Sequence, residues 1–209
     1  MFLDSLKYSF NNLKDVIRGS LQIFLGFLVL SITTDFVKLS LGQGSGSAEL
    51  IVGIVEVLAT YFFYAVIIKN CFSLIEEKQV RGVGLGFLIY LRINIIYSLL
   101  FFLGMFLILP GIWVLIFLFF APFVALDDHH QGGKFLKRSA QLVKRDILTV
   151  SILAVISVVL MSIDFAIFPL IKRAELWQLG IVVKNFVMIL IDYIFLILCS
   201  KVYTQLKRL

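Results

Sequence analysis

Six ionisable side chains lie inside long apolar stretches of this sequence, where a charge is costly and therefore informative. An ionised side chain at the centre of a membrane span costs at least about 2.5 kcal/mol, so such residues usually face other helices and have a partner. Two interpretations stay open: structural ion pairs or snorkelling to the interface, or an outward-open polar cavity that binds a cationic or zwitterionic ligand or relays protons. The six residues are Asp35, Lys38, Glu56, Asp164, Lys184 and Asp192.

Glu56 is the most informative of these residues, because six apolar or small residues precede it in its predicted span. An unpaired carboxylate at that depth is costly, so it should be neutral or face a cation. Lys38 and Lys184 are the basic residues at similar depth. We therefore expect Glu56 to point into a helix bundle near Asp35, Asp164 and one of these lysines.

Other candidates for chemistry are weak. The DDHH run at 127–130 has metal-binding residue types, but ligands adjacent in sequence rarely face one ion and no further ligands follow at zinc spacing. The G-x-G-x-G run at 82–86 follows no predicted strand, and no GxSxG, HExxH or Walker pattern is present. Cys71 and Cys199 lack the spacing of a metal site or redox pair. The sequence predicts no enzyme, no cofactor and no metal.

The elements that must position the charges are membrane spans. The chain has 209 residues, of which 61% are hydrophobic and 21 are Phe, and only 15% are charged; its mean hydropathy is +1.04. This composition excludes an ordinary soluble domain. The net charge of +6 sits at the ends of apolar stretches and is not interleaved with base-stacking aromatics, so we expect no nucleic-acid partner.

The longest apolar stretch runs from Ile93 to Leu126 and carries Pro110-Gly111 near its middle. As one helix its 34 residues would extend about 50 Å, whereas a bilayer core is about 30 Å thick. Pro and Gly suit a turn, so the stretch predicts a hairpin; one long helix kinked at Pro110 is the alternative.

We predict an all-α integral membrane protein with six transmembrane helices in three hairpins, forming one domain over residues 1–209. Placing both termini in the cytoplasm puts fifteen Lys and Arg inside and four outside, a strong positive-inside signal. A single kinked helix would move five basic residues of 134–145 outside and weaken that signal. In chain order the parts are an amphipathic helix at 1–19, hairpins at 21–68 and 88–126, an amphipathic helix at 134–146 and a hairpin at 147–200.

The two amphipathic helices are expected in the membrane interface, with their basic residues toward anionic headgroups. Their apolar stripes are Phe2, Leu3, Leu6, Phe10, Leu13 and Ile17 in one, and Leu136, Ala140, Val143 and Ile147 in the other. For the first helix, packing on the protein's own cytoplasmic face is an equal alternative. The predicted headgroup contacts are Lys7, Lys14, Arg18, Lys137, Arg138, Lys144 and Arg145.

The two helices also match each other at a fixed offset of 130 residues. Leu6-Lys7-x-Ser9 corresponds to Leu136-Lys137-x-Ser139, and Lys14 and Ile17 have counterparts in Lys144 and Ile147. Duplication of a helix-plus-hairpin unit and convergence between basic amphipathic helices both explain the match.

The run from Leu109 to Lys144 resembles the YciC-like bacterial inner-membrane proteins and is similar to the membrane domain fused to some glycerophosphodiester phosphodiesterases. The shared pattern is a Pro-Gly turn, an aromatic-rich span with a Pro, a short acidic stretch, then a Gly and a Ser-centred amphipathic helix. The resemblance implies a six-span fold in a bacterial inner membrane but no catalytic residues, and no phosphodiesterase domain is attached. The matching residues are Pro110, Gly111, Pro122, Gly133, Ser139 and Lys144.

Three functions remain as hypotheses: a non-enzymatic envelope-homeostasis or scaffold protein, a transporter or channel for a lipid or small polar solute, and a membrane-remodelling protein. The expected partners are membrane lipids, with a membrane protein or a second copy of this chain as further possibilities.

Overall fold

The computed structural model describes residues 1–41, 46–76, 83–106, 109–127, 134–172 and 176–209, and every element in them is an α-helix, which confirms the predicted all-α class. Five helical stretches are long and apolar enough to cross a membrane, one of them the whole of 109–127, or six if the sharply bent pair at 135–143 and 147–163 is counted as one more. The helices are α1 (Phe2–Gly19), α2 (Leu21–Leu41), α3 (Gly46–Glu76), α4 (Val83–Met105), α5 (Leu109–Phe117), α6 (Ala121–Asp127), α7 (Phe135–Val143), α8 (Ile147–Lys172) and α9 (Trp177–Arg208).

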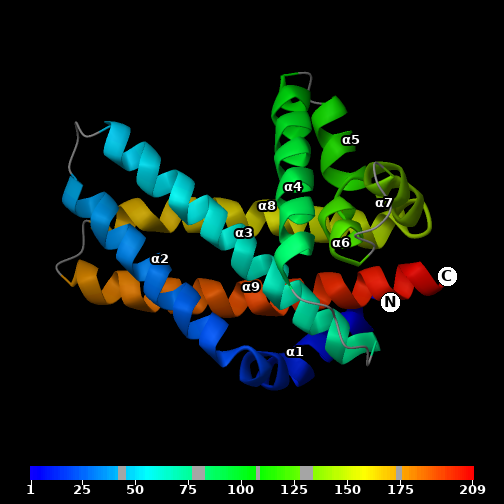
Figure 1. The fold of residues 1–209 in the computed structure, drawn as a ribbon, viewed down its shortest axis with the longest axis horizontal. Coiled ribbons are helices and arrows are strands. Elements are labelled where there is room, and N and C mark those ends of the chain that lie inside the picture. Colours follow the sequence, from blue (N-terminus) through cyan, green and yellow to red (C-terminus); the bar gives the residue numbers. More distant parts are fainter. Residues whose placement is uncertain (42–45, 77–82, 107–108, 128–133, 173–175) are drawn as a thin grey trace.

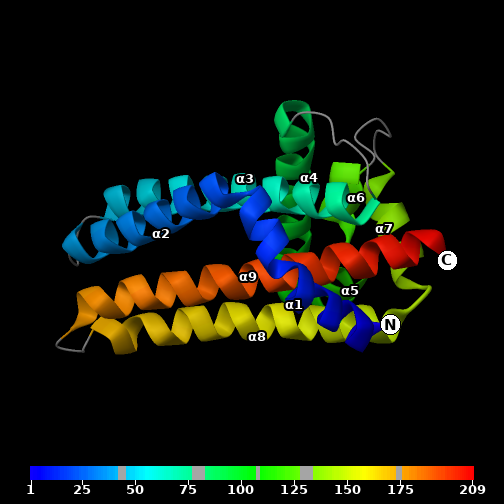
Figure 2. The same cartoon turned by 90° about the horizontal axis from the view of Figure 1, so that it is seen from below.

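Helices α8 and α9 follow the long axis of the molecule, and the α2–α3 hairpin crosses them obliquely (Figure 1). Helix α9 packs against α2, α3 and α8. The α4–α5 hairpin stands crosswise to α8 and α9 in both views (Figures 1 and 2). The hairpins are therefore not the parallel set that a simple six-span bundle would form.

The buried core surrounds the C-terminal half of α9 near both chain ends. Tyr203 is 1% exposed, and its ring lies 5.4 Å from that of Phe72 and 5.7 Å from that of Phe120. All the residues of α6 except Asp127 are buried here. The molecule is thus most tightly packed at the end that holds its termini.

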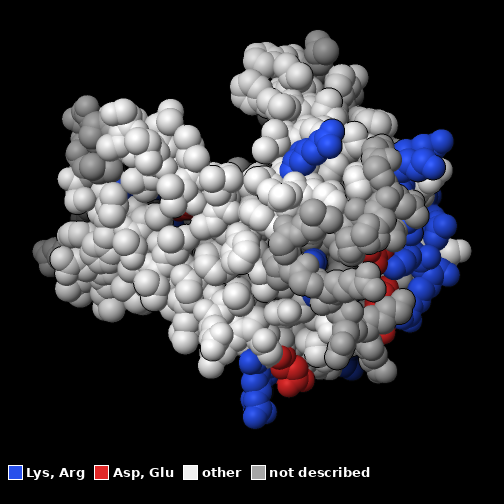
Figure 3. Space-filling model, in the orientation of Figure 1, with Lys and Arg blue, Asp and Glu red and all other residues white. Residues whose placement is uncertain are grey.

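Charge is concentrated at that same end. On the face drawn in Figure 3, Lys and Arg gather on the side of the termini, and most of the remaining surface is uncharged. The uncharged part is the surface that hydrocarbon can cover at low cost.

The α4–α5 hairpin has a different turn from the expected one. Pro110 lies in the first turn of α5, where its missing N–H costs nothing, so Pro110-Gly111 is helical and the link from α4 comes before it. Residues 107–108 of that link lie outside the described residues. A Cβ added to Gly104 would lie 2.7 Å from the backbone N of Gly111. Glycine is therefore required where the two helices meet.

The predicted span after Pro110 consists of two helices, α5 and α6, with a turn at 118–120 between them, and together they make one candidate membrane span. Pro122 has no N–H and its ring excludes the carbonyl four residues earlier, so the ladder fails at Leu118. The Leu118 carbonyl instead accepts the Ala121 N–H at 2.9 Å. The Phe117 carbonyl accepts the Ser139 hydroxyl of α7 at 2.9 Å. A side chain 22 residues away therefore satisfies the backbone at the break.

Helix α7 turns its apolar residues toward the protein. Phe135, Leu142 and Val143 are buried against a surface formed by α5, α6 and α9. Of the predicted stripe, Val143 is buried and Leu136 and Ala140 are half-buried, whereas Ile147 is exposed. Most of the stripe therefore packs on the protein and not, as expected, on the membrane. Lys137 and Lys144 are exposed, and their contact with headgroups stays a prediction.

Helix α1 packs differently from α7. It presents Ser5, Ser9 and Val16 to the bundle, and the Ser5 hydroxyl donates to Gln205 Oε1 of α9 at 2.9 Å. Small side chains allow this close approach. The counterparts Ser9 and Ser139 of the 130-residue offset are both fully buried.

We expect Ser139→Ala to lower the free energy of unfolding by about 1–3 kcal/mol, because it leaves the buried Phe117 carbonyl without a donor. Ser9→Ala is the matched control: Ser9 is equally buried, but its hydroxyl bonds the Ser5 carbonyl within its own helix. Unfolding of the purified protein in detergent measures both changes. Equal losses in the two variants would contradict the role assigned to Ser139.

Candidate functional site

A cavity of about 690 Å³ lies between the α2–α3 and α8–α9 hairpins. Five of the six charged residues singled out from the sequence line it: Asp35, Lys38, Glu56, Lys184 and Asp192. The sixth, Asp164, lies on α8, and its side chain is outside the described part of the structure. The sequence-predicted charges therefore converge on one space, although they come from three different helices.

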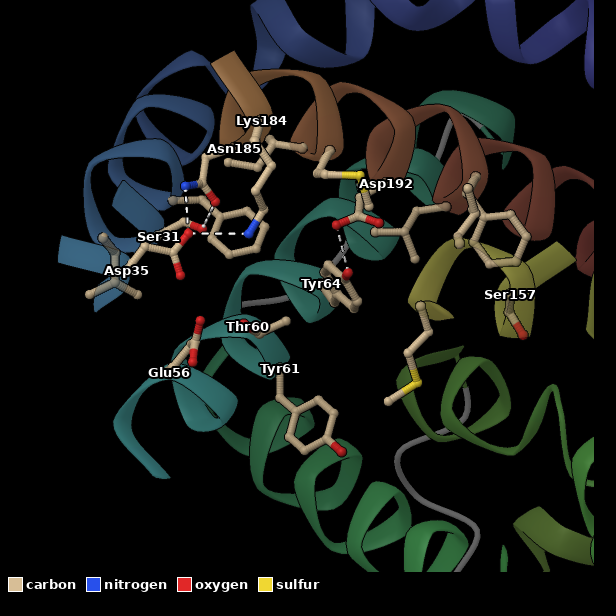
Figure 4. A pocket seen from close by; sticks show the side chains of 18 of the residues that line it. Ser31, Asp35, Glu56, Thr60, Tyr61, Tyr64, Ser157, Lys184, Asn185 and Asp192 are labelled. Carbon is tan, nitrogen blue, oxygen red and sulfur yellow. Dashed lines mark hydrogen bonds and ion pairs between the residues drawn. The ribbon is translucent and has the colours of Figure 1, made fainter. Parts of the chain in front are cut away.

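Asp35 is the centre of a buried network (Figure 4). Its Oδ2 accepts the Asn185 amide at 2.8 Å and lies 3.2 Å from Lys184 Nζ. The Ser31 hydroxyl donates to Asn185 Oδ1 at 2.6 Å. The side chains of Asp35 and Lys184 are only 6% and 8% exposed. An ion pair buried to this degree is held in place by its neutral hydrogen-bonding neighbours.

Glu56 forms an ion pair with Lys38 across the α2–α3 hairpin. These side chains are 27% and 32% exposed, so water or headgroups reach this pair more easily than the Asp35 pair. The expected lysine partner of Glu56 is thus Lys38, while Lys184 pairs with Asp35. Glu56 and Asp35 point into the same space (Figure 4).

The third carboxylate, Asp192, accepts a hydrogen bond from the Tyr64 hydroxyl at 2.8 Å. Glu56, Thr60 and Tyr64 recur every four residues on α3, which places them on one helical face toward the cavity. On α9, Asn185 and Asp192 are seven residues apart and also share a face. Two helical faces with polar residues at each turn therefore build the site.

The rest of the lining is mainly apolar. Large apolar side chains come from α2, α8 and α9. No Cys or His is among the residues that line the cavity, and no group of three metal-ligating side chains occurs among the described residues. The arrangement suits binding of a molecule with charged and apolar parts. The apolar residues include Phe27, Leu30, Leu160, Met161, Met188, Ile189 and Phe195.

Sequence reasoning missed the neutral polar members of the site. Ser31, Tyr64 and Asn185 each bind a carboxylate or its partner. Only their helical spacing relative to a charged residue could have indicated them: Ser31 precedes Asp35 by one turn, and Tyr64 follows Glu56 by two.

The acidic and histidine run at 127–130 is only partly described, because residues 128–130 lie outside the described ranges. Asp127 accepts the Tyr203 hydroxyl at 2.9 Å and pairs with Lys207 at 2.6 Å. Lys207 also lies 3.4 Å from Glu76. Asp127 therefore helps join α3, α6 and α9 at the end that holds the termini.

Comparison with family models, with curated proteins and with solved structures gives no match to this chain. The resemblance to YciC-like proteins therefore stands on the sequence pattern from Leu109 to Lys144 alone.

We expect Asp35→Leu and Lys184→Met each to destabilise the protein by about 3–5 kcal/mol, because either change removes an ion-pair partner from a buried charge. The double variant should lose less than the sum of the two single losses. Unfolding free energies in the same detergent give the coupling between the sites. Strict additivity would contradict a direct buried ion pair.

Proposed function

We propose that this chain is a non-enzymatic, multi-pass protein of a bacterial inner membrane that binds a zwitterionic phospholipid in the cavity, with a role in envelope homeostasis. The observation that carries the proposal is the convergence of both signs of charge on one apolar-walled cavity. Asp35, Glu56 and Asp192 suit an ammonium group, and Lys38 and Lys184 suit a phosphate.

The size and lining of the cavity support this proposal. Ligand sites usually have about 300–1,000 Å³, apolar walls and a few placed polar groups. The cavity of about 690 Å³ lies within that range. Figure 4 places Asp35, Glu56, Lys184 and Asn185 together at one side of the cavity, with Ser157 well away from them. A headgroup at the charged side would leave its chains against the apolar residues.

The position of the cavity supports access from the bilayer. Residues of α3 and α8 both line it, yet α8 packs mainly on α9 and α5 among the described residues. Met161 of α8 lines the cavity and is 79% exposed. A lipid can therefore approach between α3 and α8 without crossing the tightly packed end of the molecule.

The orientation in the membrane is part of the proposal. The α2–α3 and α8–α9 hairpins cross the bilayer with both termini and the basic end in the cytoplasm, as the positive-inside rule favours. In this orientation the α4–α5 hairpin, which stands crosswise to α8 and α9, lies along the membrane and not across it, in place of the remaining pair of predicted spans. Its tip is apolar and exposed, with Phe102, Phe106 and Leu109 exposed by 64%, 75% and 79%. Such a tip is stable in hydrocarbon and costly in water.

Transport of the same ligand is the alternative function. The broken α5–α6 segment favours it, because interrupted helices accompany alternating access in many transporters. An assay of fluorescent phosphatidylethanolamine moving between the leaflets of liposomes separates the two functions. If the movement requires the protein and is lost in a folded Glu56→Gln variant, the function is transport and not binding alone. Unchanged movement with and without protein supports the binding role.

We expect phosphatidylethanolamine to raise the unfolding temperature of the purified protein in detergent, because a ligand bound only by the folded state stabilises it, by about 2.7 kcal/mol at a hundred times its Kd. Ser157→Trp should abolish this rise, since Ser157 lines the cavity and a bulky ring fills it. Ser162→Trp is the matched control, on the exposed surface of the same helix. A wild-type rise in Ser157→Trp would contradict lipid binding in the cavity.

Cysteine labelling tests the orientation. We expect an impermeant maleimide added outside to label Ser47→Cys and to spare Lys137→Cys, both of which replace exposed residues. The native Cys71 and Cys199 are buried, so the background is low. Phe106→Cys should be labelled from neither side, because the apolar tip of the α4–α5 hairpin stays in hydrocarbon. Labelling of Lys137→Cys from outside would contradict the orientation.

A further inference from the structure

The two amphipathic helices use their apolar residues in opposite ways. In α7, Phe135, Leu142 and Val143 are buried in the protein. In α1 the serine face packs on α9, and the apolar stripe stays partly outside, with Leu3 75% and Phe10 57% exposed. The two helices have similar sequence patterns but pack differently, and of the two only α1 keeps an apolar surface for another molecule.

That surface contains a shallow groove of about 510 Å³ where α1 leads into α2. Five of its residues are spaced three or four apart on α1 and therefore share one face of that helix, and Leu21 follows at the start of α2. Four are apolar, and two are basic and exposed. The groove is lined by Phe10, Leu13, Lys14, Ile17, Arg18 and Leu21.

The place of the groove indicates its occupant. Leu21 is the first residue of α2, a candidate membrane span, so the groove lies where the chain enters the bilayer. Apolar side chains there suit an acyl chain, and the adjacent Lys14 and Arg18 suit a phosphate. Cationic residues beside an apolar groove complement an anionic lipid better than a zwitterionic one, whose ammonium group they repel.

We propose that this groove is a binding site for one anionic phospholipid of the leaflet that faces the termini. The site is separate from the cavity between the hairpins and does not depend on the function proposed for that cavity.

Native mass spectrometry of the full-length protein with dioleoylphosphatidylglycerol or dioleoylphosphatidylcholine, at equal concentrations, tests the site. The double variant Lys14→Gln with Arg18→Gln should weaken the binding of one phosphatidylglycerol molecule about 25-fold, because each basic residue contributes about fivefold. The binding of phosphatidylcholine should not change. Lys137→Gln with Lys144→Gln is the matched control, because these exposed basic residues of α7 adjoin a face that the protein fills. The control should change binding by less than about twofold.

A second pair of variants tests the apolar part of the groove. Phe10→Ala should weaken phosphatidylglycerol binding about fivefold, whereas Leu3→Ala, which removes an exposed side chain outside the groove, should not. All four variants change exposed residues only, so their unfolding temperatures should match that of the wild type. Equal losses in both charge variants would show diffuse attraction and overturn the proposal. A wild-type result for Phe10→Ala would also overturn it.

Discussion

Hydrocarbon offers no partner for a charge or a backbone carbonyl, so each such group in this protein must be satisfied by another part of the chain. The ion pair between Asp35 and Lys184 meets this requirement between α2 and α9, and Ser31 and Asn185 complete it. At the α5–α6 break the Ser139 hydroxyl meets it for the Phe117 carbonyl. These contacts fix how the hairpins pack, and the cavity is the space that remains between the charged faces.

The same requirement explains how much of the site the sequence could predict. Asp35, Glu56 and Lys184 are too costly to leave in lipid, so their convergence follows from their depth alone. Tyr64 and Asn185 carry no such cost, because a neutral polar side chain can bond its own helix. Their role depends on which helix lies opposite, and a single sequence does not contain that information.

The fold was predictable to a similar extent. Long apolar stretches specify helices and hairpins, and Pro122 specifies an interruption. The crosswise position of α4–α5 and the bond from Ser139 to the Phe117 carbonyl depend on packing between segments far apart in the chain. The apolar faces of α1 and α7 show the limit most clearly, because an amphipathic pattern requires an apolar neighbour but does not distinguish protein from membrane. Helix α1 packs on the protein through its serines, whereas α7 packs on it through its apolar residues.

The central claim is that a zwitterionic phospholipid occupies the cavity between the hairpins. A phosphatidylethanolamine with a photoreactive diazirine in its acyl chain, incorporated with the protein into nanodiscs, tests it most directly. Cross-linked peptides mapped by mass spectrometry should carry adducts at the cavity residues Leu160, Met188 and Ile189, and excess unlabelled phosphatidylethanolamine should remove them. Adducts confined to outward-facing positions such as Leu99 and Val183, which are 58% and 53% exposed, would contradict the account.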